Sequence, residues 1–287
     1  MHQIFLLSKE TAIIINNWFM MYFLSVVLIG TIYPIFLDVL SSEKISVGPP
    51  FYHKLIIPFL IPFLMIMAIG PKLKWIKSNL EDKIYLIILL VVSILLSILI
   101  VKNFSSNLLI NTILISSAFY LFFITLRDFF NKGFKNLAQN TAHFGFSLLI
   151  LSILFNNLFS TETITNLKVG ETFENTKTKI IFENISQKKE KNYKSIIAKF
   201  IIQDSKGKIE NLSPELRIYN QPNIVTSEAD IKTTLLSDKF IVINLVPNQD
   251  LFNVRYQVKP FMLWIWISVI LISIGGLLSF AKKEYEK

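Results

Sequence analysis

The chain has 287 residues, 52% of them hydrophobic, and a mean hydropathy of +0.52, which is too high for a water-soluble domain of this size. It contains no cysteine, which excludes disulfides, zinc–thiolate sites and thiol chemistry, so any redox role rests on a bound cofactor or a partner. The formal net charge is +9, but most of the excess of Lys and Arg flanks the apolar segments, a pattern that favours membrane orientation over nucleic-acid binding.

Six apolar segments are long enough to cross the roughly 30 Å of a bilayer's hydrocarbon core. The second contains Pro58 and Pro62 and is predicted to be kinked. The pattern predicts a polytopic α-helical membrane protein, with five transmembrane helices in residues 1–159 and a last transmembrane helix with a cytoplasmic tail in residues 260–287. The expected spans are residues 13–37, 54–71, 84–101, 108–126, 138–159 and 261–280.

Basic side chains gather in the loop after the second segment, in the loop after the fourth and in the C-terminal tail. With six spans these three regions fall on one side of the membrane, which the positive-inside rule makes cytoplasmic. Both termini are therefore expected to be cytoplasmic. The residues concerned are Lys72, Lys74, Lys77, Lys83, Arg127, Lys132, Lys135, Lys282, Lys283 and Lys287.

Residues 160–259 differ in composition from the rest of the chain. In "TKIIFENI", "SIIAKFIIQ" and "FIVINLV", β-branched and aromatic residues alternate with polar ones, and turn signals such as "DSKGK" and "NQPN" separate the runs. The segment is predicted to be an all-β domain outside the membrane, on the side opposite the cytoplasm, inserted before the last helix. It holds no His, no Cys and no Gly-rich phosphate loop, so we expect a structural or docking role.

His143 lies inside the fifth apolar segment, in "NTAHFGFSLLILSILF". It follows Lys135 by eight residues, about 12 Å along a helix, which places it below the headgroups on the cytoplasmic half of the span. An ionisable side chain is costly in lipid and usually functional. Three uses are open at this point: axial ligation of a metalloporphyrin, a proton relay, or an interhelical hydrogen bond.

The other histidines and the tryptophans of the last helix have simpler explanations. His2 belongs to a terminal arm, and His53 lies at the outer edge of the second helix, where water is available. Trp264 and Trp266 occupy the position of an aromatic belt at the membrane interface.

Small residues surround His143 and recur in the last helix. Ala142, Gly145 and Ser147 permit close approach of another helix or of a flat macrocycle. Gly275 and Gly276 are predicted to form a contact surface for helix packing.

Several stretches, taken in order, resemble the C-terminal half of CcmF, the haem lyase component of the system I cytochrome c maturation pathway. The resemblance extends from about Lys9 to the last helix, and its specificity comes from the combination of motifs. These motifs are "SVGPP" before the second helix, the "AHFG" helix, and "VKPFMLWIW" after the β domain.

The resemblance implies a subunit of the bacterial inner membrane that assists covalent attachment of haem to apocytochrome c. Members of the family carry a transmembrane b-type haem held by two membrane histidines, and one of these matches His143. By resemblance, His143 is the cofactor-binding residue and an axial ligand of the haem iron. The implied partners are a CcmE-like haem chaperone, a CcmH-like subunit that presents apocytochrome c, and apocytochrome c itself.

Members of the family extend further on the N-terminal side, where they carry a Trp-rich haem-handling segment, the second membrane histidine and two outward-facing histidines. None of these has a counterpart in this sequence. We therefore expect no catalytic residue in this chain and no ligation activity without an N-terminal CcmF half that supplies the second ligand of the b-haem. A split gene, a truncated product or a fragment would each account for the pattern.

Two interpretations without haem remain open. In one, the chain is a membrane sensor or a structural, docking protein whose β domain binds a ligand while His143 bonds across helices. In the other, a transporter subunit uses His143 as a proton relay. For the transporter interpretation, the sequence lacks an accompanying carboxylate within a span, since Asp38 and Asp128 both lie at predicted helix ends.

Overall fold

The computed structural model describes residues 8–41, 45–75, 83–104, 107–131, 136–176, 178–204, 207–247 and 249–285. Contacts divide the chain into a helical unit, formed by Met1–Leu154 and Ser268–Lys287, and a β unit, formed by Phe155–Ile267. Among the residues singled out above, His2, Lys77, Lys132, Lys135 and Lys287 and the side chains of Lys282 and Lys283 lie outside the described part.

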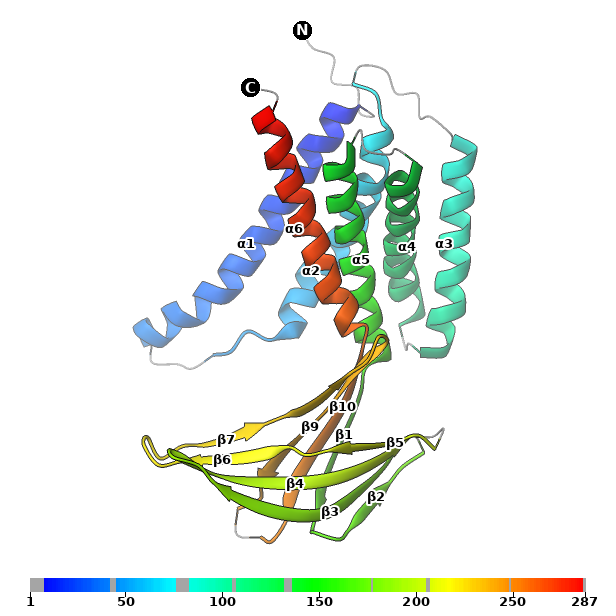
Figure 1. Ribbon diagram of the computed structural model, residues 1–287. Coiled ribbons are helices and arrows are strands. Elements are labelled where there is room, and N and C mark those ends of the chain that lie inside the picture. Colours follow the sequence, from blue (N-terminus) through cyan, green and yellow to red (C-terminus); the bar gives the residue numbers. More distant parts are fainter. Residues whose placement is uncertain are drawn as a thin grey trace. The chain divides into compact units, whose positions relative to one another are not determined.

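Six helices in the described ranges are long and apolar enough to cross a membrane, which confirms the predicted class (Figure 1). The most buried is α4, which packs against α2 and α3. A short 3-10 turn, Gly70–Lys72, follows α2. The helices are α1 (Lys9–Ser41), α2 (Pro49–Ile69), α3 (Lys83–Phe104), α4 (Leu108–Asn131), α5 (Leu137–Phe159) and α6 (Met262–Tyr285).

Two helices, α1 and α2, begin four or more residues earlier than hydropathy predicts, and each has a local cause. The Ser8 hydroxyl accepts a hydrogen bond from the Thr11 amide at 3.2 Å, which caps α1 four residues before the expected start. Pro49 and Pro50 occupy the first positions of α2, where the missing amide hydrogens leave no helical bond unmade. Hydropathy marks the apolar part of a helix, whereas these capping residues mark its end.

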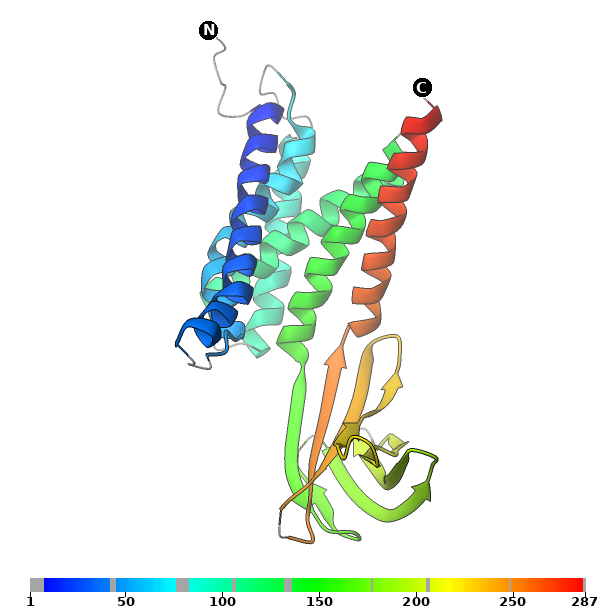
Figure 2. The ribbon, with the colours of Figure 1, turned by 90° about the vertical axis from the view of Figure 1, so that its left-hand side faces the viewer.

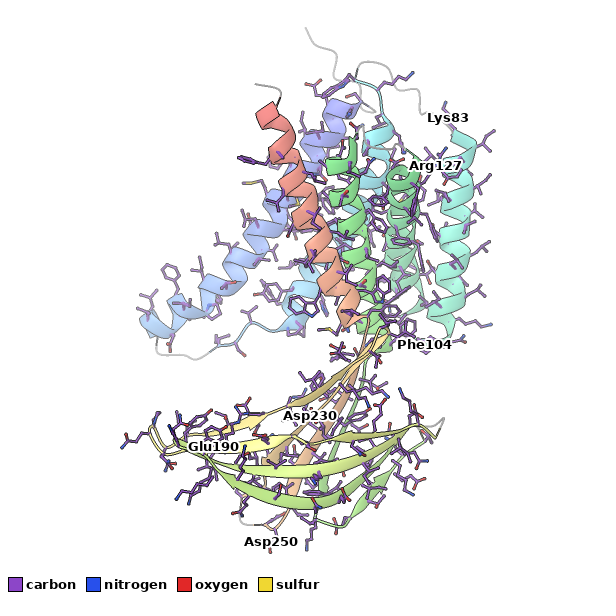
Figure 3. The ribbon with its side chains drawn as sticks, viewed as in Figure 1. Lys83, Phe104, Arg127, Glu190, Asp230 and Asp250 are labelled. Carbon is purple, nitrogen blue, oxygen red and sulfur yellow. The ribbon has the colours of Figure 1, made fainter. Side chains whose placement is uncertain are left out.

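Two basic residues lie at one end of neighbouring helices. Lys83 and Arg127 lie at the same end of α3 and α4, and Phe104 lies at the other (Figure 3). The Arg127 guanidinium stacks 3.9 Å from the centre of the Tyr85 ring, which fixes these two ends together. These two basic residues lie at the end where the sequence predicts cations, but α3 also carries Lys102 in its last turn, at the opposite end.

The described strands form two antiparallel sheets, so the all-β domain is a sandwich rather than a single barrel. One sheet has the order β1-β10-β9-β8, and the other has the order β2-β3-β4-β6-β7, with β5 also paired to β4. The strands are β1 (Thr161–Leu167), β2 (Thr172–Glu174), β3 (Thr178–Lys189), β4 (Tyr193–Asp204), β5 (Ile209–Leu212), β6 (Glu215–Tyr219), β7 (Val225–Glu228), β8 (Asp230–Thr233), β9 (Ser237–Leu245) and β10 (Phe252–Pro260).

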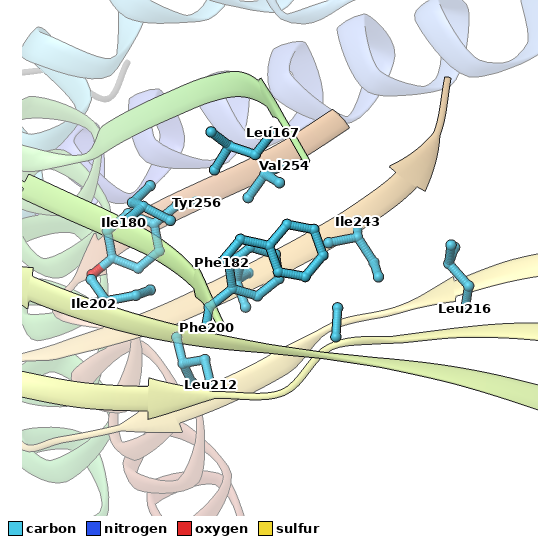
Figure 4. Close-up of a cluster of buried hydrophobic side chains, with 12 residues drawn as sticks. Leu167, Ile180, Phe182, Phe200, Ile202, Leu212, Leu216, Ile243, Val254 and Tyr256 are labelled. Atoms are coloured by element: carbon cyan, nitrogen blue, oxygen red, sulfur yellow. The ribbon is translucent and has the colours of Figure 1, made fainter. Parts of the chain in front are cut away.

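The core of the sandwich is built on two aromatic rings. Phe182 and Phe200 are opposite each other in β3 and β4, and their stacked ring centres are 4.4 Å apart (Figure 4). Ile241, Ile243 and Val254 come from the facing sheet and are fully buried. The alternation of apolar and polar residues along each strand places these side chains on the inner face.

One inward-facing position of the sandwich carries a charge. Glu210 on β5 is 3% exposed, and its carboxylate pairs with Lys208 at 3.0 Å and with Lys239 at 2.9 Å. Burial alone would raise the pKa of the Glu210 carboxyl, but the hydrogen bonds from Lys239 and Lys208 outweigh it and leave the pKa below its usual value. The pair is therefore ionised at neutral pH inside an otherwise apolar layer.

The β unit joins the chain's helices at one end of the first sheet. β1 begins two residues after α5 ends, and β10 ends at Pro260, two residues before α6 begins (Figure 2). Phe261, between β10 and α6, has φ = 61°, a conformation that bulky residues rarely adopt. The Asn156 side-chain amide donates to the Pro260 carbonyl at 2.6 Å and links the two junctions.

Candidate functional site

His143 lies in the second turn of α5, where its imidazole is half-buried. Gln139, one turn earlier, shares its face of the helix. Among the cavities bordered by described residues, three have both Gln139 and His143 in their walls. The imidazole is thus at the meeting point of several open spaces within the helical unit.

The first cavity lies between α1, α2 and α5 and has a volume of about 230 Å³. Its walls are mostly apolar, but Lys9 and Asn16 of α1 also face it. The Asn16 side-chain oxygen is buried and has no hydrogen-bond partner among the described residues, so this wall holds an unsatisfied acceptor. The apolar lining is provided by Ala12, Ile13, Ile66, Met67 and Pro71.

The second cavity, of about 90 Å³, is polar and brings Asp128 to the same space as His143. Asp128 forms an ion pair with Lys72, and both side chains are largely buried. Its backbone carbonyl accepts a hydrogen bond from the Asn140 side chain at 3.1 Å. The sequence correctly places Asp128 in the last turn of its helix, yet the fold sets that turn beside the histidine.

The third cavity lies between α5 and α6 and is the largest of these, at about 580 Å³. A Cβ added to Gly275 would come within 2.6 Å of the Ala142 backbone nitrogen, so the two helices touch there. A Cβ added to Gly276 would meet nothing within 4 Å. The expected packing role is confirmed for Gly275, whereas Gly276 faces open space beside His143.

Packing on three sides fixes the rotation of α5 and so the direction of its histidine. Phe144 stacks on Phe129 of α4 with ring centres 5.3 Å apart. Phe146 meets Phe63 of α2 edge to face at 6.1 Å. Gly145 lets α6 approach, since an added Cβ would lie 2.9 Å from its backbone. Because these contacts follow in successive residues, the imidazole has little freedom to move around the helix axis.

The remaining residues singled out in the sequence do not join this site. His53 is exposed in the first turns of α2. The Trp264 indole nitrogen donates to the Leu235 carbonyl at 2.9 Å, and Trp266 is 61% exposed. In the part of the chain that the structure describes, no three His, Cys, Asp or Glu residues are close enough to hold a metal ion. Among the described residues, the site around His143 therefore supplies one imidazole rather than a complete set of metal ligands.

Sequence reasoning missed the polar surroundings of His143. Lys9 and Asn16 are seven residues apart, two helical turns, and both line the first cavity. Gln139 and Asn140 stand at the start of an apolar helix, where polar side chains are a usable signal. The pairing of Lys72 with Asp128 joins residues 56 positions apart and leaves no local pattern in the sequence.

Comparison with known proteins gives consistent matches. Residues 158–260 match a family model described as the CcmF C-terminal beta-sandwich. Cytochrome c-type biogenesis protein CcmF of Pseudomonas fluorescens is 27% identical over 97% of this chain and 44% of its own length. The CcmF protein of Escherichia coli K12 is 25% identical over 98% of this chain and 45% of its own length.

A solved structure titled Cytochrome c Heme Lyase CcmF has the same fold, with a TM-score of 0.72 over 95% of this chain and 46% of that one, at 20% sequence identity. The chain thus spans less than half the length of the curated relatives it matches. The family model, the relatives and the solved fold agree: the chain is similar to CcmF over nearly its whole length, and its β unit is similar to the C-terminal beta-sandwich of that family.

Proposed function

We propose that the chain is the C-terminal part of a CcmF-type cytochrome c haem lyase and that His143 is an axial ligand of a b-type haem within the membrane. The observation that carries the proposal is a half-buried imidazole, held in a membrane-spanning helix, that borders three cavities in the described part of the chain. Ligation of iron by a neutral imidazole is a physical reason to keep this side chain in an apolar setting.

The residues around His143 fit a porphyrin. The largest cavity falls within the size range of small-molecule sites, and Ala142, Gly276 and Ser279 give it a wall of small side chains. Lys9 lines the other two cavities, where it offers an ammonium group to the carboxylates of the haem. When bound, the haem supplies one-electron chemistry, while this chain's residues hold it, orient it and exclude water.

The wider assignment rests on the similarity to CcmF. The chain would work with an N-terminal CcmF half that supplies the second haem ligand, and with a CcmE-like haem chaperone and a CcmH-like subunit that presents apocytochrome c. It would reside in the bacterial inner membrane with both termini cytoplasmic. The β unit would lie in the periplasm, where apocytochrome c arrives. No residue of this chain is assigned to bond formation between haem and apocytochrome c.

The test is a reduced-minus-oxidised absorption spectrum of the chain purified with its candidate N-terminal half. We expect a b-type α-band that is lost or shifted in His143→Ala and retained in His53→Ala, whose imidazole is exposed. Equal spectra for all three proteins would place the ligand elsewhere. Absence of haem from an assembled wild-type complex would remove the proposal.

A second candidate is a proton relay, which the shared cavity of His143 and Asp128 favours. Lys72 would then hold the Asp128 carboxylate, and Asn140, which donates to the Asp128 backbone carbonyl, would hold the turn that carries it. This candidate predicts proton movement across reconstituted vesicles that depends on His143 and on Asp128 and needs no haem. The absorption spectrum separates it from the first, since a relay gives no α-band.

A further inference from the structure

The turn between β8 and β9 exposes two adjacent leucines. Leu235 is 72% exposed and Leu236 is 67% exposed. Thr234 closes the turn, because its side chain donates to the Ser237 carbonyl at 2.7 Å and accepts the Ser237 amide at 3.1 Å. A hydrogen-bonded turn that presents two adjacent large apolar side chains favours contact with an apolar partner.

This turn is hydrogen-bonded to the first residues of α6. The Phe261 amide donates to the Leu236 carbonyl at 2.9 Å, and the Trp264 indole donates to the Leu235 carbonyl at 2.9 Å. The apolar span of α6 starts at Met262. The leucines are therefore beside the first residues of a helix that is long and apolar enough to span a membrane.

The second helix connection lies at the same end of the sheet. Thr161, two residues after α5, pairs with Val258 of β10, and Pro260 pairs with Ser237 at the start of β9. Both helices thus leave the same end of this sheet as the β8–β9 turn. The opposite end is the β9–β10 turn, which contains Asp250, about 25–30 Å away along strands of nine residues.

We propose that Leu235 and Leu236 insert into the interfacial layer of the bilayer beside the start of α6, and that this turn is a second membrane contact of the β unit. The ligand is a phospholipid surface: the leucines would reach the upper acyl chains, and the exposed Lys232 on β8 would face the headgroup phosphates. Trp264, which holds the turn, belongs to a residue type enriched at this depth. Such a contact restrains rotation of the β unit about its helix connections.

The absence of cysteine from the chain makes single-site labelling straightforward. Leu235→Cys and, separately, Leu236→Cys would carry an environment-sensitive fluorophore in the full chain, reconstituted in phosphatidylcholine–phosphatidylglycerol vesicles. Asp250→Cys, on the far turn of the same sheet, is the matched control. The quenchers are lipids with a nitroxide near the headgroup or near the end of the acyl chain. Both leucine sites are exposed, so labelling them leaves the core packing unchanged.

The expected result is blue-shifted emission at the two leucine sites and severalfold stronger quenching by the shallow nitroxide than at Asp250. Quenching equal to that of the Asp250 control would overturn the proposal. Blue-shifted emission that no lipid nitroxide quenches would also overturn it, because a protein partner would then cover the turn. Membrane contact by this turn is independent of haem ligation by His143, and labelling reports on it whether or not haem is bound.

Discussion

The buried charge of the β unit gives a prediction with a definite magnitude. In Glu210→Gln, Lys239 loses its partner while its side chain is only 14% exposed. Removing one member of a fully buried pair costs about 3–5 kcal/mol, and the residual exposure of Lys239 reduces this to about 2–3 kcal/mol. Lys208, at 58% exposure, contributes little because water screens its charge.

Pulse proteolysis of the full chain in urea measures this cost, since a protease cuts the β unit only when it is unfolded. At about 1.5 kcal/mol per molar urea, the midpoint should fall by about 1–2 M in Glu210→Gln. Lys208→Gln is the control and should change it little. The double replacement Glu210→Leu with Lys239→Leu should recover most of the loss, because it removes both buried charges.

The same pair makes the β unit sensitive to acid. The pKa of Glu210 is lower in the folded chain than in the unfolded one, so the unfolded state binds more protons as the pH falls. The stabilisation is complete above the unfolded pKa and disappears as the pH falls through the folded pKa.

If Glu210→Gln had the wild-type midpoint at neutral pH, or if Lys208→Gln cost as much as Glu210→Gln, the assignment of the energy to the Lys239 pair would be wrong.

Two further predictions concern the helical unit. Thermal unfolding in detergent should show that Gly275→Ala lowers the free energy of unfolding by about 1–3 kcal/mol, because the added Cβ would press on the Ala142 backbone. Gly276→Ala should be neutral, and equal effects of the two variants would contradict the α5–α6 contact. Asp128→Asn should destabilise the helical unit by about 1–3 kcal/mol, because it weakens the pairing with the largely buried Lys72. Asp38 is exposed, so Asp38→Asn should have no such effect. A neutral Asp128→Asn would show that the pair adds no stability.

Much of the fold could be predicted because each signal is local. Apolar runs of about 20 residues identify the spans, and alternation in "FIVINLV" identifies β9. Helix starts were less accurate, since Ser8 and Pro49 act through backbone hydrogen bonding rather than hydropathy. The sandwich was not distinguishable from a barrel, because the pairing of β1 with β10 joins residues at opposite ends of the domain.

The candidate site also has one part that a local sequence signal predicts and another that depends on packing. His143 is identifiable because an ionisable residue in an apolar run is unusual. The ion pair that brings Lys72 to Asp128, and the cavity that Asp128 shares with His143, depend on the packing of α2, α4 and α5 and have no local sequence signal. Glu210 was missed for a related reason: its two lysine partners make a buried carboxylate possible at an inward position that alternation assigns to an apolar residue.

Chemical rescue tests the role of His143 most directly. The chain carrying His143→Gly, assembled with its N-terminal half, would be titrated with free imidazole while the reduced-minus-oxidised spectrum is recorded. We expect the b-type α-band to be lost or shifted in the variant and to return in a saturable way with imidazole, whereas His53→Gly keeps the wild-type band throughout. A band of wild-type position and intensity in His143→Gly without imidazole would contradict the assignment of His143 as the haem ligand.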